Sequence, residues 1–130
     1  MQNKELIELA LKARESAYAP YSNFFVGAAL LCDDGNVYCG CNIENTAFSP
    51  TCCAERVAIF KAISEGKRKF SAIAIVGAPK NGEMKMCYPC GVCRQVLSEF
   101  CDGSLKIVLY DGEKIAETTL GTLLPNAFDF

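Results

Sequence analysis

Three cysteines and one glutamate form the part of this sequence that could do chemistry. Cys53 is followed two residues later by Glu55, and Cys90 and Cys93 form a C-x-x-C pair directly after Pro89. Each group is expected at the start of a helix, where exposed backbone N–H groups and the helix dipole favour thiolates. Three thiolates can hold one zinc ion and leave its fourth position open to water, which is typical of a catalytic zinc site.

Glu55 is expected to lie beside the metal and not on it. A carboxylate in that place can take a proton from water and return it to a substrate nitrogen. Three thiolates give the zinc site a net negative charge, which we expect Arg56 and Arg94 to offset from positions next to the ligands. A Cys or His ligand, a Glu two residues later and a distant P-C-x-x-C are the known signature of zinc deaminases, which act on an amino-bearing ring carbon.

Two other uses of the cysteines stay open. A redox C-x-x-C pair normally follows a strand directly, whereas a loop rich in Pro, Gly and Lys precedes Cys90, and the Cys53–Glu55 group would stay unexplained. A structural zinc site needs a fourth ligand, which Cys52 or Cys87 could supply, and would make the chain a non-catalytic zinc-binding module. Histidine is absent, which excludes serine triads and Cys–His nucleophile pairs.

The composition predicts one globular domain over residues 1–130, with 51% hydrophobic and 22% charged residues. The net charge of -2 gives no broad positive field, so we expect a small uncharged partner and no nucleic acid. No apolar run approaches the roughly 18 residues of a membrane helix and the N-terminus is polar, so we expect no membrane contact and a cytoplasmic location. The nine cysteines are odd in number and are therefore expected to be reduced thiols.

Apolar spacing predicts a layered arrangement of helices and strands. The predicted helices are residues 2–17, 54–63, 92–100 and 120–124. The predicted strands are residues 25–32, 37–43, 72–76, 105–110 and 114–117, with an Asp-Gly turn joining the first two. A helix, a hairpin and then alternating helices and strands indicate an α/β or α+β fold.

Three further segments resemble the small homotetrameric cytidine deaminases, and with the cysteine motifs the likeness covers nearly the whole chain. Residues 18–30, YAPYSNFFVGAAL, are similar to that family's N-terminal signature, and residues 40–45, GCNIEN, to its nucleoside-binding segment. The tail LLPNAF at residues 123–128 is also similar. The resemblance implies a three-layer α/β/α fold with a mixed five-stranded sheet, a homotetramer whose subunits share sites, and one zinc ion per subunit.

The same resemblance implies a set of substrate-binding residues. Asn42 and Glu44 would hydrogen-bond the ribose 3′-hydroxyl, and Phe24 would pack against the nucleoside. The backbone of Ala54 would meet the pyrimidine carbonyl. Phe128 would reach a neighbouring subunit's site and stack on the base.

These observations predict a zinc-dependent hydrolytic deaminase that converts cytidine and deoxycytidine into uridine and deoxyuridine, with release of ammonia, in pyrimidine salvage. One residue departs from the family: Phe48 stands where tyrosine is common, whose hydroxyl approaches the 5′ side of the sugar across the subunit boundary. The enzymatic alternative is a deaminase of the same fold acting on blasticidin S or another amino-heterocycle. The segment Asn42-Ile43-Glu44 favours the nucleoside.

Overall fold

The fold is a single mixed sheet with helices on both faces, seen in a computed structural model that describes residues 1–129. The helices are α1 (Asn3–Arg14), α2 (Ala54–Ser64), α3 (Gly91–Phe100) and α4 (Leu120–Leu123). The strands are β1 (Phe24–Cys32), β2 (Val37–Cys41), β3 (Phe70–Pro79), β4 (Lys106–Tyr110) and β5 (Ile115–Thr119). Their order in the five-stranded sheet is β2-β1-β3-β4-β5, with β3 and β4 parallel and the other neighbours antiparallel. The mixed five-stranded sheet is therefore confirmed.

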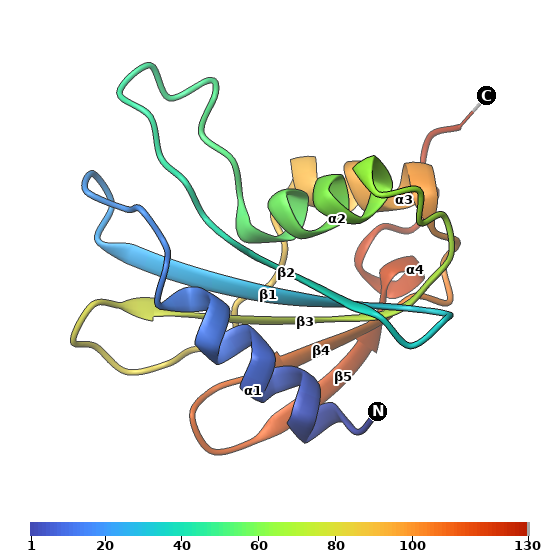
Figure 1. The fold of residues 1–130 in the computed structure, drawn as a ribbon, viewed down its shortest axis with the longest axis horizontal. Coiled ribbons are helices and arrows are strands. Elements are labelled where there is room, and N and C mark those ends of the chain that lie inside the picture. The colour runs from blue at the N-terminus through green and yellow to red at the C-terminus, as the bar shows by residue number, and fades with distance from the viewer. Residues whose placement is uncertain (130) are drawn as a thin grey trace.

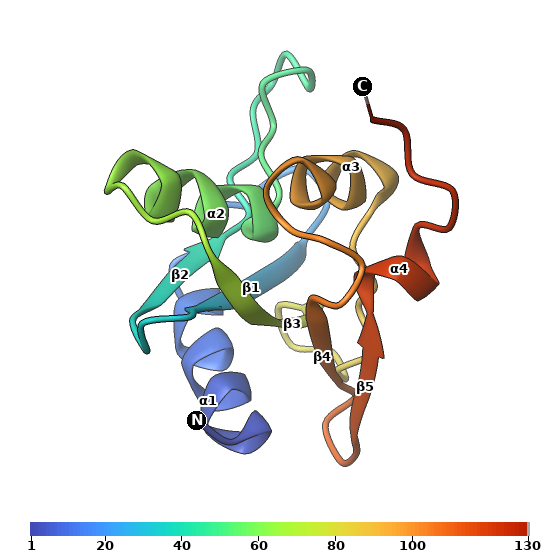
Figure 2. The ribbon, with the colours of Figure 1, turned by 90° about the vertical axis from the view of Figure 1, so that its right-hand side faces the viewer.

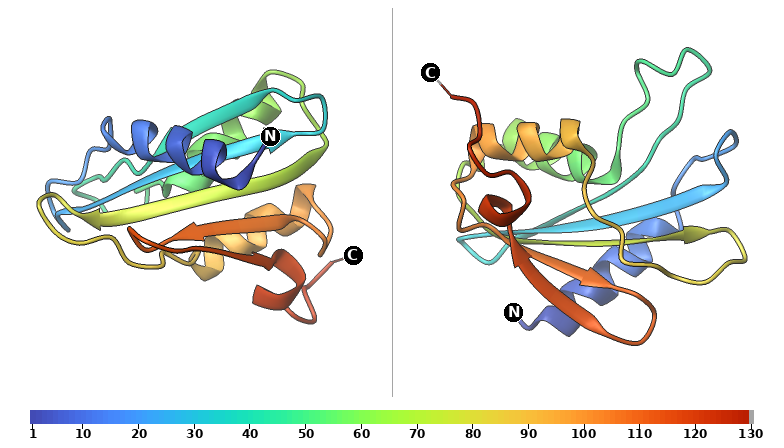
Figure 3. Two further views of the ribbon diagram at one scale, coloured as in Figure 1. Left: turned by 90° about the horizontal axis from the view of Figure 1, so that it is seen from below. Right: turned by 180° about the vertical axis from the view of Figure 1, so that it is seen from behind.

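The helices form one layer on each side of the sheet. Helix α1 lies on one face, while α2 and α3 lie side by side on the other (Figures 1 and 2). Seen from below, α1 crosses β1 and β3 (Figure 3), and its buried residues Leu6 and Ile7 pack there with Val76. On the opposite face, Ile59 of α2 and Leu97 of α3 pack into a second apolar cluster. This arrangement confirms the predicted α/β/α layers.

Helix α1 is shorter than the predicted 2–17, because residues 15–17 form turns with hydrogen bonds to the carbonyls three residues back. The last residue of the helix, Arg14, turns its side chain to the sheet. Its guanidinium donates to the carbonyl oxygens of Phe25, Ala78 and Pro79 at 2.8, 2.9 and 3.0 Å. Helix α1 thus ends at the residue whose side chain is bonded to the sheet, although the apolar spacing continues beyond it.

Strands β3 and β2 also have other ends than predicted. Strand β3 runs past the predicted 72–76 at both ends because it pairs with β1 along the whole length of that strand. Strand β2 stops at Cys41, short of the predicted residue 43, because Ile43 leaves the ladder and forms bridges with Tyr18 and Cys52. The loops on either side of these bridges rise from one end of the sheet (Figure 1).

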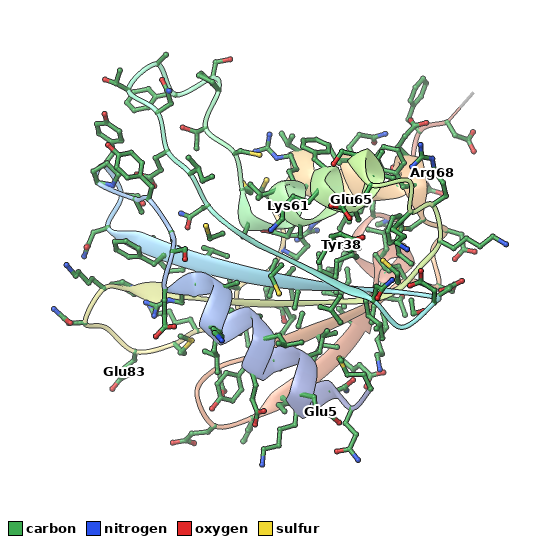
Figure 4. All side chains as sticks on the ribbon, in the orientation of Figure 1. Glu5, Tyr38, Lys61, Glu65, Arg68 and Glu83 are labelled. Atoms are coloured by element: carbon green, nitrogen blue, oxygen red, sulfur yellow. The ribbon has the colours of Figure 1, made fainter. Side chains whose placement is uncertain are left out.

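Helix α2 approaches strand β2 very closely. A Cβ atom added at Gly40 would lie 2.5 Å from the carbonyl oxygen of Ala54 and 2.6 Å from the nitrogen of Ala58. Two side-chain contacts also join these elements (Figure 4): the Tyr38 hydroxyl donates to Glu65 at 3.1 Å, and Lys61 donates to the Cys39 carbonyl at 2.5 Å. The first turn of α2 is therefore placed by backbone packing against the sheet.

Gly40→Ala is expected to lower the free energy of unfolding by about 1–3 kcal/mol, because the added methyl group forces α2 away from β2. Gly91→Ala is the matched control, since a Cβ there meets no atom within 4 Å. Urea unfolding of both variants measures the difference. Equal stability of Gly40→Ala and the wild type would show that the close approach has no role in positioning α2.

None of the helices in residues 1–129 has both the length and the apolar character that a membrane-spanning segment requires.

Candidate active site

The first turns of α2 and α3 bring the predicted metal ligands together. Cys53 is the N-cap of α2 and Cys90 is the N-cap of α3, both with extended backbone, and Cys93 lies in the first turn of α3. The two helices are neighbours on the same face of the sheet (Figure 2). Two helix N-termini therefore stabilise negative charge at one place.

The sulfur positions suit a zinc ion. The Sγ atoms of Cys53, Cys90 and Cys93 all lie within 4.8 Å of one another, and those of Cys53 and Cys90 are 3.9 Å apart. Sulfurs bound to tetrahedral zinc at about 2.3 Å are separated by about 3.8 Å. Cys93 is buried and Cys90 is exposed, so the cluster is reached from one side. The donor chemistry and spacing could hold one zinc ion with three protein ligands.

Cys52 and Cys87 are not members of this cluster. Both thiols are free and half-buried, and both residues line the cavity beside it. Within residues 1–129, the group of possible ligands contains three cysteines and no fourth residue. A closed four-sulfur site, which a purely structural zinc would need, therefore has no support in this arrangement.

The thiols of Cys53 and Cys93 differ in acidity. A hydrogen bond from the Cys93 thiol, assisted by the Arg56 guanidinium, lowers the pKa of the Cys53 thiol. The same hydrogen bond and burial raise the pKa of Cys93, which keeps its proton. Zinc binding must therefore release protons from the remaining thiols.

Arg56 lies where the sequence predicts a charge-balancing group. Its Nη2 atom donates to Cys53 Sγ at 3.3 Å. Its Nε atom is buried without a hydrogen-bond partner, a cost that the attraction to the neighbouring thiolate offsets. The guanidinium thus neutralises part of the negative charge that three thiolates would create.

The hydrogen bonds of Arg94 go to backbone carbonyls, so its charge-balancing role stays a prediction. Its Nε atom donates to the Pro89 carbonyl at 2.7 Å and its Nη1 atom to the Leu123 carbonyl at 2.8 Å. The side chain thus ties the loop before Cys90 to the end of α4. Its place directly after Cys93 in the sequence did not reveal these contacts, because residues that follow each other on a helix point in different directions.

Glu55 is the buried carboxyl group next to the sulfurs. It lies in the first turn of α2 and is only 4% exposed. Burial raises the pKa of its carboxyl group to about 7. A carboxyl group with such a pKa can both accept and donate a proton near neutral pH, as a general acid and base must.

A cavity of about 290 Å³ opens beside the sulfur cluster. Polar, aromatic and sulfur-bearing groups share its wall. The lining residues are Ser22, Phe24, Val26, Asn42, Glu44, Thr51, Cys52, Cys53, Ala54, Glu55, Cys87, Tyr88 and Cys90. Four of the five predicted substrate-binding residues, Phe24, Asn42, Glu44 and Ala54, therefore meet the predicted catalytic residue in one cavity.

The fifth predicted binding residue, Phe128, does not line this cavity. It lies in the C-terminal tail and is 68% exposed. The prediction assigns it to a neighbouring subunit's site, so a single chain does not test it.

The side chain of Asn42 is fixed by the first strand. Its Oδ1 atom accepts a hydrogen bond from the Val26 nitrogen at 2.9 Å, and its Nδ2 atom donates to the Phe24 carbonyl at 2.8 Å. One N–H of the amide remains for a ligand. Asn42 is therefore both an anchor for the start of β1 and a possible hydrogen-bond donor in the cavity.

Sequence reasoning missed several cavity residues. Ser22, Thr51 and Tyr88 bring hydroxyl groups to the wall. Tyr88 directly precedes Pro89 and Cys90, so its closeness in sequence to a metal ligand could have predicted its place in the cavity wall. Thr51 lies in an irregular loop, where no periodicity indicates which side chains face inward.

Comparison with known proteins agrees with this geometry. Residues 1–109 match the family model described as the cytidine and deoxycytidylate deaminase zinc-binding region. The chain therefore belongs to the cytidine and deoxycytidylate deaminase family, which is a family of zinc-binding enzymes.

Individual relatives align over nearly the full length. A cytidine deaminase of Sporosarcina psychrophila is 54% identical over 129 residues, covering 98% of this chain and 92% of the relative. A cytidine deaminase of Halalkalibacterium halodurans is 50% identical, covering 98% of this chain and 95% of the relative. The crystal structure of a cytidine deaminase from Burkholderia pseudomallei superposes with a TM-score of 0.91 at 47% identity, covering 98% of this chain and 100% of that one. These matches support the same fold and zinc chemistry here.

Proposed function

We propose that this chain catalyses the hydrolytic deamination of cytidine and deoxycytidine to uridine and deoxyuridine, with release of ammonia. The observation that carries the proposal is that a buried carboxyl group, Glu55, lines the same cavity as Cys53 and Cys90, two members of the three-sulfur cluster. Relatives named cytidine deaminases, at 54% and 50% identity, support the substrate.

Glu55 moves the protons in this proposal. Cys53, Cys90 and Cys93 would hold a zinc ion, which would supply the Lewis acid that makes water acidic enough to react near neutral pH. Glu55 accepts the proton that the attacking water gives up and donates it to the ring nitrogen N3. A second proton passes through Glu55 to the amino group at C4, the C4–N bond breaks, and one ammonia leaves for each water consumed.

The cavity wall supports a neutral nucleoside as the ligand. Phe24 offers an apolar ring to the nucleoside, and Asn42 and Glu44 offer a donor and an acceptor to the sugar. Of the lining residues in the described chain, two are carboxylic acids and none is lysine or arginine. A phosphate group would therefore be repelled, which favours nucleosides over nucleotides.

We extend the proposal to a cytoplasmic homotetramer in pyrimidine salvage whose subunits share sites. Large apolar side chains lie exposed on the single chain, among them Phe48 at 72% and Phe128 at 68%. Exposed aromatic groups of this kind are typical of surfaces that other chains cover. Light scattering that gives four times the subunit mass supports the tetramer, and the mass of a single chain would contradict it.

The test of the activity is the loss of cytidine ultraviolet absorbance in the presence of the purified zinc-loaded protein. We expect turnover of cytidine and deoxycytidine, loss of turnover after chelation, and recovery when zinc is added back. Cytosine and blasticidin S are assayed in parallel. Faster turnover of blasticidin S would favour the antibiotic deaminase, and no turnover of any substrate by zinc-loaded protein would favour a non-catalytic zinc-binding module.

A further inference from the structure

The carboxylate of Glu44 is held by the loop between α1 and β1. Its Oε1 atom accepts hydrogen bonds from the backbone nitrogens of Tyr21 and Ser22 at 3.0 and 3.1 Å. Its Oε2 atom accepts a hydrogen bond from the Ser22 hydroxyl. Among residues 1–129, Ser22 supplies the one side-chain hydrogen bond that this carboxylate receives. Glu44 is thus oriented before any ligand arrives.

The Ser22 hydroxyl has a fixed direction. Its oxygen accepts a hydrogen bond from the Phe24 nitrogen at 3.0 Å, so its hydrogen is left to point at Glu44. The hydrogen bonds from the Ser22 hydroxyl and then from the two backbone nitrogens lower the pKa of the Glu44 carboxyl group. Glu44 therefore stays a pure hydrogen-bond acceptor with lone pairs left for a ligand.

The backbone holds this loop against the strand end that carries Glu44. The nitrogen of Tyr18 donates to the Asn42 carbonyl at 2.9 Å, and the nitrogen of Glu44 donates to the Tyr18 carbonyl at 2.9 Å. Asn23 has a φ of 58°, in the left-handed region that Asn tolerates better than most residues. We therefore expect the loop to stay in place when the Ser22 hydroxyl and its two hydrogen bonds are removed.

We propose that Ser22 is a positioning residue that fixes the Glu44 carboxylate in the orientation that receives a sugar hydroxyl of the substrate. Ser22 and Glu44 both line the cavity that contains Glu55. The inference rests on the proposed nucleoside deamination and adds a residue that acts on sugar recognition through Glu44. Preorganisation of this kind strengthens binding because the carboxylate loses less freedom when the ligand arrives.

Ser22→Ala tests the inference with two substrates, cytidine and 2′,3′-dideoxycytidine, which lacks the 2′- and 3′-hydroxyls and keeps the 5′-hydroxyl. For cytidine, KM is expected to rise about tenfold with kcat within about twofold, since a hydrogen bond to a charged group is worth about that factor. For dideoxycytidine, KM is expected to stay at the wild-type value. Ser22→Thr keeps a hydroxyl and is expected to restore most of the affinity for cytidine.

The controls separate positioning from general damage. Ser71→Ala removes a serine hydroxyl that donates to Asp33 over a distance of 2.6 Å. Both residues lie in a different part of the surface from this cavity, so the substitution is expected to leave both KM values unchanged. In a Glu44→Ala background, Ser22→Ala is expected to raise KM for cytidine no further, because Ser22 acts through Glu44.

Two outcomes would overturn this inference and leave the proposed function standing. One is an unchanged KM for cytidine in Ser22→Ala. The other is an equal rise in KM for both substrates, which would show that the variant acts through the lost hydrogen bond to the Phe24 nitrogen and not through Glu44. Absence of cytidine turnover by the wild type would instead overturn the proposed function and the inference with it. The wild-type assay comes first, so the two failures are distinguishable.

Discussion

Glu55→Gln is expected to lower kcat for cytidine by about 10² to 10⁴-fold, the usual contribution of a general acid and base. Glutamine keeps the size of the side chain but cannot carry a proton between water and the ring nitrogen. Because Glu55 lies outside the sulfur cluster, zinc content is expected to stay at one ion per chain. Steady-state kinetics and elemental analysis of the same preparation measure both quantities.

Glu99→Gln is the matched control for this substitution. Glu99 is an exposed residue of α3 and does not line the cavity, so its kcat is expected to equal that of the wild type. Full activity of Glu55→Gln would remove Glu55 from the mechanism. Loss of zinc from Glu55→Gln would show that the carboxylate holds the metal and does not move protons.

Cys93→Ser is expected to remove most of the bound zinc and, with it, the activity. Cys93 is fully buried and supplies one of three sulfurs, and a serine hydroxyl does not ionise to replace a thiolate. Zinc affinity should fall more than about 100-fold, beyond the 10 to 100-fold typical of outer-shell changes. Competition with a chromogenic chelator measures the affinity, and cytidine turnover should fall with the zinc content.

Thermal unfolding gives a second readout, because an ion that binds only the folded chain raises its Tm. The wild type is expected to unfold at a higher temperature with zinc than after chelation, and Cys93→Ser is expected to show no such difference. Cys39→Ser, which changes a half-buried thiol packed on the α1 side of the sheet, should behave as the wild type does. A zinc-dependent Tm in Cys93→Ser would show that the metal lies elsewhere.

Much of the site could be predicted because its spacing follows helix geometry. Cys90 and Cys93 stand three residues apart at the start of α3, so one helical turn presents both to the same side. Cys53 is the N-cap of α2 and Glu55 lies in its first turn, so both belong to the start of one helix. The layers could be predicted because the apolar runs of the sheet and helices are local signals. The assigned roles of these residues stay predictions.

What could not be predicted depends on partners far away in the chain. The length of β3 follows its pairing with β1, and the last residue of α1, Arg14, is bonded to carbonyls of the sheet. Arg94 turns to the carbonyls of Pro89 and Leu123, which its place beside the C-x-x-C pair does not reveal. Ser22 is important only because the loop folds back on Glu44, and no periodicity encodes that contact.

The central claim is that one zinc ion is bound by three cysteine sulfurs and keeps one position for water. X-ray absorption at the zinc edge of the reconstituted full chain tests it most directly. We expect three sulfur neighbours at about 2.3 Å and one oxygen or nitrogen neighbour at about 2.0 Å. Four sulfur neighbours would contradict the account, because a closed site leaves no place for the water that the reaction consumes.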